Sequence, residues 1–547
     1  MIARLPRWAR AALAFTLLAQ FVLRADASLR AESPVWDEFL HLDYGLNFLR
    51  LGPVISPADH PYPAVALQAL PLVLAEPAPE QIAGRPTLPT GEVADIRVID
   101  DPRNLIPPRR VTLGLATLGL LIFAGLSARR FGQTTGLLVL TLGSIDPGWI
   151  AHARYLTTDT LLGTAMAVGA FALDSHRRTR SRLALGAAGV AAGLGLLAKL
   201  SAVFLVPAAF LAHCWPSAET TKPPRLWRER TWDGLRAAVA VAIVAGVIVV
   251  VAFEAHALLG RAPFGVGLRH LAAGLRRLAE VRGQEHGTFL LGAYFEGGTV
   301  LYFPVLLLAK TPVALLIAAG SSALREARLR LRGTAPLFTL PALYLAVAMA
   351  SRMGLGHRHL TPVLPFVWLL ASLGLQALVA RLRGWGPRVA ALLVVLAALE
   401  SVACHPNYLP FTNVLFGGER GAHRVAVDSA SDWGQALPLA GAYVAEHEGE
   451  PPHLAYFGTA DPARYGLEDA VWRPCGTLGR PHTRGQPRAG CAEPASLLLI
   501  SATCLQGAAA LSLARDDCWR RLRDRVPDAV LGGSILVYRD VPPGARP

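Results

Sequence analysis

An acidic pair and a histidine lie close together near the start of the chain, in the run Trp36-Asp37-Glu38-Phe39-Leu40-His41. A positioned carboxylate can take a proton from an attacking hydroxyl or amine, which is general base chemistry. Asp37 is the first candidate for such a base and the adjacent Glu38 is its rival. His41 and the downstream His60 are candidates for the surrounding pocket. The alternative is negative charge at a helix start on a solvated face.

A second candidate acid, Asp159, lies in the run "RYLTTDTLL" from Arg154. It could act beside Asp37, or it could only cap the helix that follows. Tyr155, in the same run, is a further pocket candidate. Asp37 and Asp159 are far apart in the sequence, so they can act together only if the fold places them on one face of the molecule.

Cations complement these acids. The chain has only three lysines, and two of them, Lys199 and Lys310, are embedded in apolar sequence. A charge in such a place is costly, and by default it lines a cavity or meets a partner, although a long side chain can also reach the membrane interface. His357 and Arg358 stand together in the run "GHRHLTP". Lysine, arginine and histidine beside lipid suit a phosphate or pyrophosphate.

Carboxylates and cations on one face would suit group transfer from a phospholipid carrier, because the base activates the acceptor while the cations stabilise the departing phosphate. A cofactor is not indicated with certainty. A divalent cation could be held by Asp37, Glu38, His41 and His60, but their spacing is not diagnostic of a metal.

The composition indicates which elements must position these residues. Of 547 residues, 53% are hydrophobic and only 17% are charged, against roughly 25% in soluble domains. The mean hydropathy is +0.39. The net charge is +14, but the arginines flank apolar blocks and form no separate basic domain, which argues against nucleic acid as a partner. The chain is therefore predicted to be a polytopic helical membrane protein whose partner is the lipid bilayer.

The apolar blocks predict about eleven transmembrane helices. They lie at 11–23, 111–127, 133–150, 159–174, 183–198, 200–215, 237–255, 302–322, 335–351, 360–379 and 389–404. The stretch 183–215 is too long for one span, and we expect a break at Ala198-Lys199-Leu200-Ser201. The first block could instead be a cleaved signal peptide, but an uncleaved first span is favoured.

Arginine clusters follow every second block, which places the N-terminus inside and the C-terminus outside by the positive-inside rule. The long outside segments are then 25–110, 256–301 and 405–547. Within the first, Leu40, Tyr44, Phe48 and Leu51 recur at helical spacing, which predicts an amphipathic helix on the membrane surface. All candidate site residues then face the same side.

Two domains are expected: a transmembrane catalytic module at 1–404 and an extracytoplasmic α/β domain at 405–547. In the second domain, short apolar runs predict strands and helical patterns separate them. The strands are expected at 423–427, 454–457, 497–500 and 535–538, and the helices at 433–446 and 508–524.

Four cysteines, Cys475, Cys491, Cys504 and Cys518, lie in this outside domain. An even number in an oxidising compartment predicts two disulfides. The simplest pairing joins neighbours in the sequence, Cys475 to Cys491 and Cys504 to Cys518, although connectivity does not follow from sequence alone.

Several motifs, in order along the chain, resemble bacterial glycosyltransferases of the protein O-mannosyltransferase and aminoarabinose transferase type. These are, after the Asp37-Glu38 pair, "DHPYPAVALQALPL" from Asp59, "YLTTDTLL" from Tyr155, "LLAKLS" from Leu196, "YFPVLLLAKTP" from Tyr302, "RHLTPVLPF" from Arg358, "NYLPFTNVLFGGERGAHRVAVDSASDWGQAL" from Asn407 and "YFGTADPARYG" from Tyr456.

The resemblance implies a GT-C fold and an inverting transfer of a hexosyl or pentosyl group from a polyprenyl-phosphate carrier. The acceptor would be a protein, lipid or glycan at the outer face of the cytoplasmic membrane. It implies Asp37 as base, Asp159 as a second essential acid, and Lys310 and Arg358 as cavity or phosphate contacts. The "DHPYP" run and the short 183–215 hairpin depart from the family pattern. The segment Asp432-Trp433-Gly434-Gln435 matches well but has no evident chemical role.

Two other classes of protein remain as alternatives. A lipid-linked sugar flippase would be expected to show an internal repeat and charges near the bilayer midplane, and neither is evident. An envelope scaffold would leave Lys310 and the acidic loops without a purpose.

Overall fold

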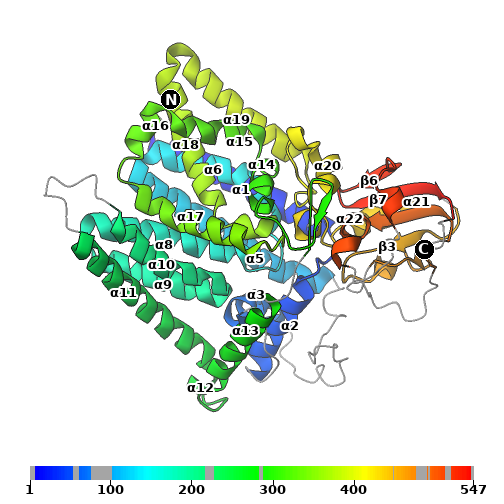
Figure 1. Ribbon diagram of the computed structural model, residues 1–547, viewed down its shortest axis with the longest axis horizontal. Coiled ribbons are helices and arrows are strands. Elements are labelled where there is room, and N and C mark those ends of the chain that lie inside the picture. Colours follow the sequence, from blue (N-terminus) through cyan, green and yellow to red (C-terminus); the bar gives the residue numbers. More distant parts are fainter. Residues whose placement is uncertain are drawn as a thin grey trace.

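The computed structural model describes residues 6–52, 61–75, 102–215, 227–282, 287–447, 449–475, 489–490, 493–511 and 519–543. A body of packed helices forms one part of the molecule, and a smaller part built around a sheet lies beside it, with the C-terminus in the smaller part (Figure 1). His60 lies outside the described residues.

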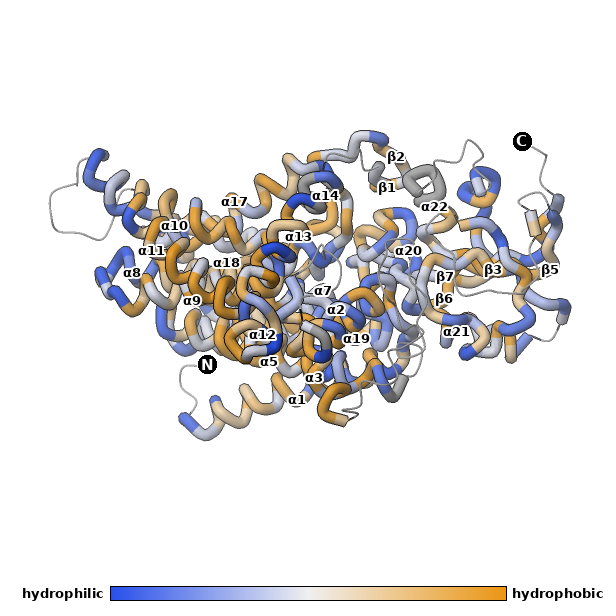
Figure 2. The backbone as a smooth tube through the Cα atoms, turned by 90° about the horizontal axis from the view of Figure 1, so that it is seen from below, coloured by the Kyte–Doolittle hydropathy of each residue, from blue (hydrophilic) through white to orange (hydrophobic). Residues whose placement is uncertain are grey.

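Each apolar block of the sequence coincides with a helix or a pair of helices. They are α1 (Arg7–Ala31), α5 (Pro102–Phe131), α6 (Gln133–Ile145), α8 (Asp159–Thr179), α9 (Arg182–Ala198), α10 (Leu205–Cys214), α11 (Trp227–Phe253), α14 (Tyr302–Ala309) with α15 (Val313–Gly320), α17 (Ala335–Ser351), α18 (Leu364–Arg381) and α19 (Gly386–Ala403). Figure 2 shows hydrophobic residues along these helices, and hydrophilic ones gathered at the end where α8 stops and α11 starts.

Length and composition alone identify fewer spans than the expected eleven. Among the described helices, five are long and apolar enough to cross a membrane, or six if the bent pair α14–α15 is one span: Arg7–Ala31, Asn104–Phe131, Trp227–Phe253, Leu364–Arg381 and Arg383–Ala403. The other apolar helices are shorter. The 13 residues of α6 reach only about 20 Å, less than the roughly 30 Å of a hydrocarbon core.

The helices of the expected 183–215 hairpin break at the predicted position. Helix α9 ends at Ala198, Lys199 is extended with φ −158° and ψ 135°, and a 3-10 turn (Leu200–Phe204) leads into α10. Both α9 and α10 pack against α11, and α9 also packs against α8. The break therefore lies where the polar interruption predicts it.

The predicted amphipathic helix forms α2 (Glu38–Leu51), but its apolar face is covered. Tyr44 and Phe48 pack with Tyr62 and Val65 of α3 (Tyr62–Ala75). The pairing explains the spacing of apolar residues in α2 without requiring that this helix lie bare on the membrane.

A five-stranded sheet of order β4-β3-β5-β7-β6 forms the centre of the C-terminal part. Strand β3 (His453–Ala455) pairs in parallel with β4 (Val471–Trp472) and β5 (Ala495–Ser501). Strand β7 (Ile535–Val541) pairs antiparallel with β5 and with β6 (Ala529–Leu531). Three of the four predicted strands are thus present, and the mixed α/β character is confirmed.

The fourth predicted strand, 423–427, is wrong. Residues Gly418–Val425 form helix α20. Its buried residues Ala422, His423 and Val425 recur at helical spacing, which a five-residue apolar run cannot reveal. The helix predicted at 433–446 is present as α21 (Leu437–Ala445). The helix predicted at 508–524 is wrong for most of the described residues, because α22 (Ala502–Leu511) shares only 508–511 with it and Arg520–Leu522 forms a 3-10 turn.

The predicted disulfide pairing is also wrong. Cys475 is bonded to Cys504, with their Cα atoms 4.9 Å apart. Cys475 follows β4 and Cys504 lies in the first turn of α22, directly after β5. The fold therefore brings together residues that are 29 positions apart in the sequence. Cys491 and Cys518 lie outside the described residues.

Candidate active site

The loop that carries the acidic pair leads from α1 to α2 and lies against the C-terminal part of the chain. Ser33 N donates to the Gln435 carbonyl at 3.1 Å and Trp36 N donates to the Trp433 carbonyl at 3.0 Å. The ring of Trp36 stacks on Phe457 at a centroid distance of 5.2 Å. Contacts from both parts of the chain thus fix the position of Asp37.

Glu38 is buried inside the protein. It accepts two hydrogen bonds from the guanidinium of Arg109, at 2.7 and 2.6 Å. The backbone N–H groups of Val35 and Leu156 donate to its two carboxylate oxygens, each at 2.9 Å. Both side chains of the Glu38–Arg109 pair are at most 1% exposed. The carboxylate oxygens of Glu38 are therefore committed to holding three segments of the chain together.

A second buried network lies next to Glu38. Glu32 accepts from Arg154 at 2.5 and 2.9 Å and from the Tyr155 hydroxyl at 2.6 Å. Burial raises the pKa of Tyr155 well above its ordinary value. Tyr155 was expected in the acceptor or donor pocket, but its hydroxyl is bound to Glu32.

Asp37, unlike Glu38, turns its carboxylate toward a different partner. It forms an ion pair with Arg358, and the two side chains are 16% and 12% exposed. Arg358 belongs to the 3-10 turn η5 (His357–Leu360) before α18. Burial opposes the charge of Arg358, yet the carboxylates of Asp37 and Asp159 raise its pKa above the ordinary value. The arginine is therefore a fixed cation facing both candidate acids.

Asp159 is the first residue of α8, and its carboxylate does not cap that helix, whose N-cap is Thr158. It accepts instead from Lys199 Nζ at 2.7 Å. The Thr361 hydroxyl, beyond η5, donates to the Asp159 carbonyl at 2.9 Å. The second acid is thus tied to the lysine of the α9–α10 break and to the segment that carries Arg358.

His41 lies close to both acids. Its Nδ1 is 2.7 Å from the Leu156 carbonyl. Burial lowers the pKa of His41, and the negative charges of Asp37 and Asp159 only partly oppose this effect. Its position supports the expectation that the two acids share one face.

The other two candidate phosphate contacts, Lys310 and His357, are buried and contact other protein groups. Lys310 is 3% exposed, and its Nζ donates to the carbonyls of Leu409, at 2.8 Å, and of Ala430. His357 is 2% exposed and stacks on His152 at a centroid distance of 5.7 Å. Lys310 therefore joins the helical part of the chain to the C-terminal part.

Several residues of this site were missed in the sequence analysis. Arg109 belongs to an Arg-Arg pair at a span end, which resembles ordinary flanking charge. Glu32, Arg154 and His152 showed no distinguishing pattern. Trp433 lies in a motif that was noted but given no role. Among the described residues, no group of three or more histidine, cysteine, aspartate or glutamate side chains is arranged to hold a metal ion.

The middle of the chain is similar to one protein family. Residues 110–250 match the dolichyl-phosphate-mannose-protein mannosyltransferase family. This stretch, about a quarter of the chain, runs from α5 to α11 and includes Asp159 and Lys199. The match confirms the resemblance that the motifs indicated: a family of glycosyltransferases named for a lipid-phosphate-linked sugar donor. No curated protein sequence matches the chain.

Solved structures show a distant likeness over most of the chain. ArnT from Cupriavidus metallidurans in the apo state has 15% identity and a TM-score of 0.48, over 97% of this chain and 98% of that chain. The same protein bound to undecaprenyl phosphate has 14% identity and a TM-score of 0.47, over 96% and 97%. The Saccharomyces cerevisiae protein O-mannosyltransferase Pmt1-Pmt2 complex bound to the sugar donor has 16% identity and a TM-score of 0.32, over 52% and 39%.

Proposed function

We propose that the protein is a glycosyltransferase that moves a sugar from a polyprenyl-phosphate carrier to an acceptor at the outer face of the cytoplasmic membrane. The observation that carries this proposal is the meeting of Asp37, Asp159, Lys199 and Arg358, which come from four separate segments of the chain. The family match over 110–250 supports the class of donor. The acceptor would be a protein, a lipid or a glycan.

In the proposed reaction, Asp37 takes the proton from the acceptor hydroxyl or amine as the acceptor atom bonds to the anomeric carbon. The bond between that carbon and the phosphate oxygen breaks, and its electron pair leaves with the lipid phosphate. Arg358 and Lys199 stabilise the charge on the departing phosphate. A single displacement of this kind inverts the anomeric centre.

The geometry favours Asp37 over Glu38 as the base. The Glu38 carboxylate is buried and accepts from Arg109 and two backbone N–H groups, so it cannot reach an acceptor without breaking that network. The Asp37 carboxylate is partly exposed and forms an ion pair with Arg358. In this proposal Tyr155 and Lys310 support the site through their protein contacts, and His41 and His357 form its inner wall.

The orientation can be tested with reporter fusions at Pro224 and at the C-terminus. The arginine alternation predicts that the first lies inside and the second outside. Two reporters on the same side would separate the candidate residues from the outer leaflet and would contradict the mechanism.

The function can be tested by mass spectrometry of envelope glycoconjugates and lipid-linked sugars in a deletion strain. We expect one glycoconjugate to lose a sugar while the corresponding lipid-linked sugar accumulates. Wild-type protein should restore both, and Asp37→Asn at normal membrane abundance should restore neither. Unchanged glycoconjugates and lipid-linked sugars in the deletion strain would contradict the proposal.

A further inference from the structure

The segment Asp432-Trp433-Gly434-Gln435 contacts the loop that carries Asp37 in the candidate site. Besides the two backbone hydrogen bonds to the acidic loop, the Ser33 hydroxyl donates to the Gly434 carbonyl at 2.8 Å. In all three contacts the 432–435 segment contributes only backbone carbonyls. The Trp433 side chain makes none of these three hydrogen bonds, and it packs instead in a hydrophobic cluster with Val35 and Tyr155.

The indole ring of Trp433 has another neighbour. The guanidinium carbon of Arg358 lies 4.6 Å from the ring centroid, and the Tyr155 ring meets the indole edge-on at 5.9 Å. Trp433 is 1% exposed. Arg358 thus has an aromatic face as one neighbour and the Asp37 carboxylate as another, and tryptophan offers the strongest aromatic face for a cation.

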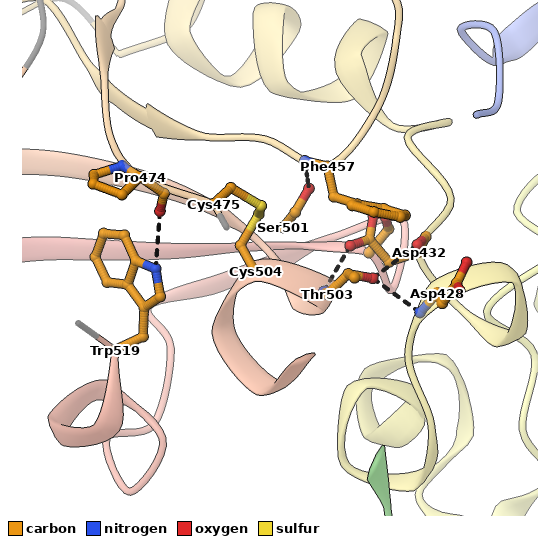
Figure 3. The surroundings of a disulfide bond; sticks show 10 residues. Asp428, Asp432, Phe457, Pro474, Cys475, Ser501, Thr503, Cys504 and Trp519 are labelled. Atoms are coloured by element: carbon orange, nitrogen blue, oxygen red, sulfur yellow. Dashed lines mark hydrogen bonds between the residues drawn. A yellow bond between two sulfur atoms is a disulfide. The ribbon is translucent and has the colours of Figure 1, made fainter. Parts of the chain in front are cut away.

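Other residues of the C-terminal part hold the segment in place, and Figure 3 shows the contact between Asp432 and Thr503. Its carboxylate accepts from Thr503 N at 2.7 Å and from the Ser534 hydroxyl at 2.6 Å. The Tyr456 hydroxyl donates to the Gly434 carbonyl at 2.6 Å. Gly434 has φ +95°, and a Cβ there would lie 2.8 Å from the Cα of Gly458, so glycine is required. These contacts fix the backbone of the segment, and so they can determine where the Trp433 indole lies.

We propose that Trp433 is a positioning residue of the transferase proposed above: its indole holds the Arg358 guanidinium against Asp37 and at the place where the lipid phosphate departs. The C-terminal part of the chain then contributes directly to the geometry of transfer. Because this inference rests on the proposed function, its test must be able to fail separately from that function.

The test compares Trp433→Leu, Trp433→Phe and Trp519→Leu in the full-length protein, with Arg358→Gln as reference. Trp519 is a matched control, because it is also a buried tryptophan of the C-terminal part, at 4% exposure, and its indole N–H donates to the Pro474 carbonyl. Membrane abundance is measured for every variant. Transfer is measured by complementation of the deletion strain, and binding is measured on purified protein with undecaprenyl phosphate as the probe.

We expect Trp433→Leu to lower transfer by about 10–100-fold, because small errors in position are costly in a transferase. Trp433→Phe keeps an aromatic face and should retain most of the activity. Trp519→Leu should transfer like the wild type once abundance is taken into account. In the double variant Trp433→Leu/Arg358→Gln, the two losses should not add, since both act through the same guanidinium.

Normal transfer by Trp433→Leu, or additive losses in the double variant, would overturn the positioning role. If Trp433→Leu does not accumulate in the membrane, the transfer activity of Trp433→Phe tests the positioning role, because the phenyl ring fills most of the same space. Equal losses in Trp433→Phe and Arg358→Gln would then count against an aromatic face as the operative feature. If Asp37→Asn and Arg358→Gln both transfer normally, the proposed function itself fails.

Discussion

Arg358 forms an ion pair with Asp37, although the two residues are separated by most of the chain. The arginine comes from the turn before α18, and the aspartate from the loop before α2. The contact therefore joins two segments that lie far apart in the sequence. Asp159 is a second carboxylate near Arg358. In the proposed reaction, the departing lipid phosphate would replace a carboxylate as the anion beside this arginine.

The adjacent acids Asp37 and Glu38 are expected to respond differently to neutralisation. Asp37→Asn should lower transfer by about 10²–10⁴-fold, the usual contribution of a general base. The protein should still accumulate, because Arg358 keeps the Asp159 carboxylate and the Trp433 ring as neighbours. Glu38→Gln leaves the Arg109 charge buried without its counter-charge, which typically costs about 3–5 kcal/mol of unfolding free energy. Immunoblots of membranes and complementation of the deletion strain measure the two effects.

The contrast between these two variants is the decisive result. A Glu38→Gln protein that is stable and abundant but inactive would assign the base to Glu38. An Asp37→Asn protein with normal transfer would remove Asp37 from the mechanism.

The ion pair of Asp159 and Lys199 predicts coupling between two distant motifs. Their side chains are 3% and 15% exposed, so each single substitution, Asp159→Asn or Lys199→Met, leaves a largely buried charge without its partner. We expect each single variant to lose both stability and transfer, and the double variant to recover stability but not transfer. Thermal unfolding of the purified proteins separates the two quantities, and additive losses of stability would show that the two charges do not interact.

The sequence predicted the positions of the apolar helices well, because a run of apolar residues has a physical cause that acts locally. The break at Lys199 is an example, since one charge in a long apolar run marks the turn. What could not be predicted depends on contacts between distant segments. Glu38 and Asp37 are adjacent and chemically similar, but Glu38 pairs with Arg109 and Asp37 with Arg358, and both arginines come from distant segments.

The same limit explains the errors in the C-terminal part. Sequence proximity suggested Cys475 with Cys491, but parallel pairing of β3 with β4 and β5 brings Cys475 to Cys504. Trp433 could not be assigned a role because its partner Arg358 lies in another part of the chain. The motif was visible in the sequence, while its function depends on the docking of one part on the other.

The disulfide predicts a measurable connection in a peptide map. A non-reducing digest should contain one species that joins the Cys475 and Cys504 peptides. Replacing both cysteines by serine should lower the unfolding free energy of the C-terminal part by about 2–4 kcal/mol, as expected for removing such a cross-link. Thr503, beside Cys504, donates to Asp432, so transfer should also fall. A map with Cys475 linked to Cys491 would contradict the fold of this region.

The raised pKa of Asp432 predicts how the stability of the folded protein depends on pH. Burial raises the pKa of Asp432 to about 6, although hydrogen bonds from Ser534 and Thr503 favour the ionised form. Since the pKa in the folded protein lies above the ordinary value of 3.8, the folded chain holds this proton more tightly than the unfolded chain. The resulting stabilisation is complete below about pH 4 and is lost as the pH rises through about 6.

The thermal unfolding midpoint of the purified protein should therefore fall as the pH is raised from 5 to 7, with Asp432 contributing at most about 1.4 kcal/mol per pH unit. Asp432→Asn cannot titrate, so its midpoint should fall less steeply over the same range. The comparison of slopes isolates Asp432 from other groups, such as Asp428, whose pKa burial also raises to about 6. Equal slopes in the two proteins would mean that Asp432 keeps an ordinary pKa and that its carboxylate is not held in a buried network beneath the site.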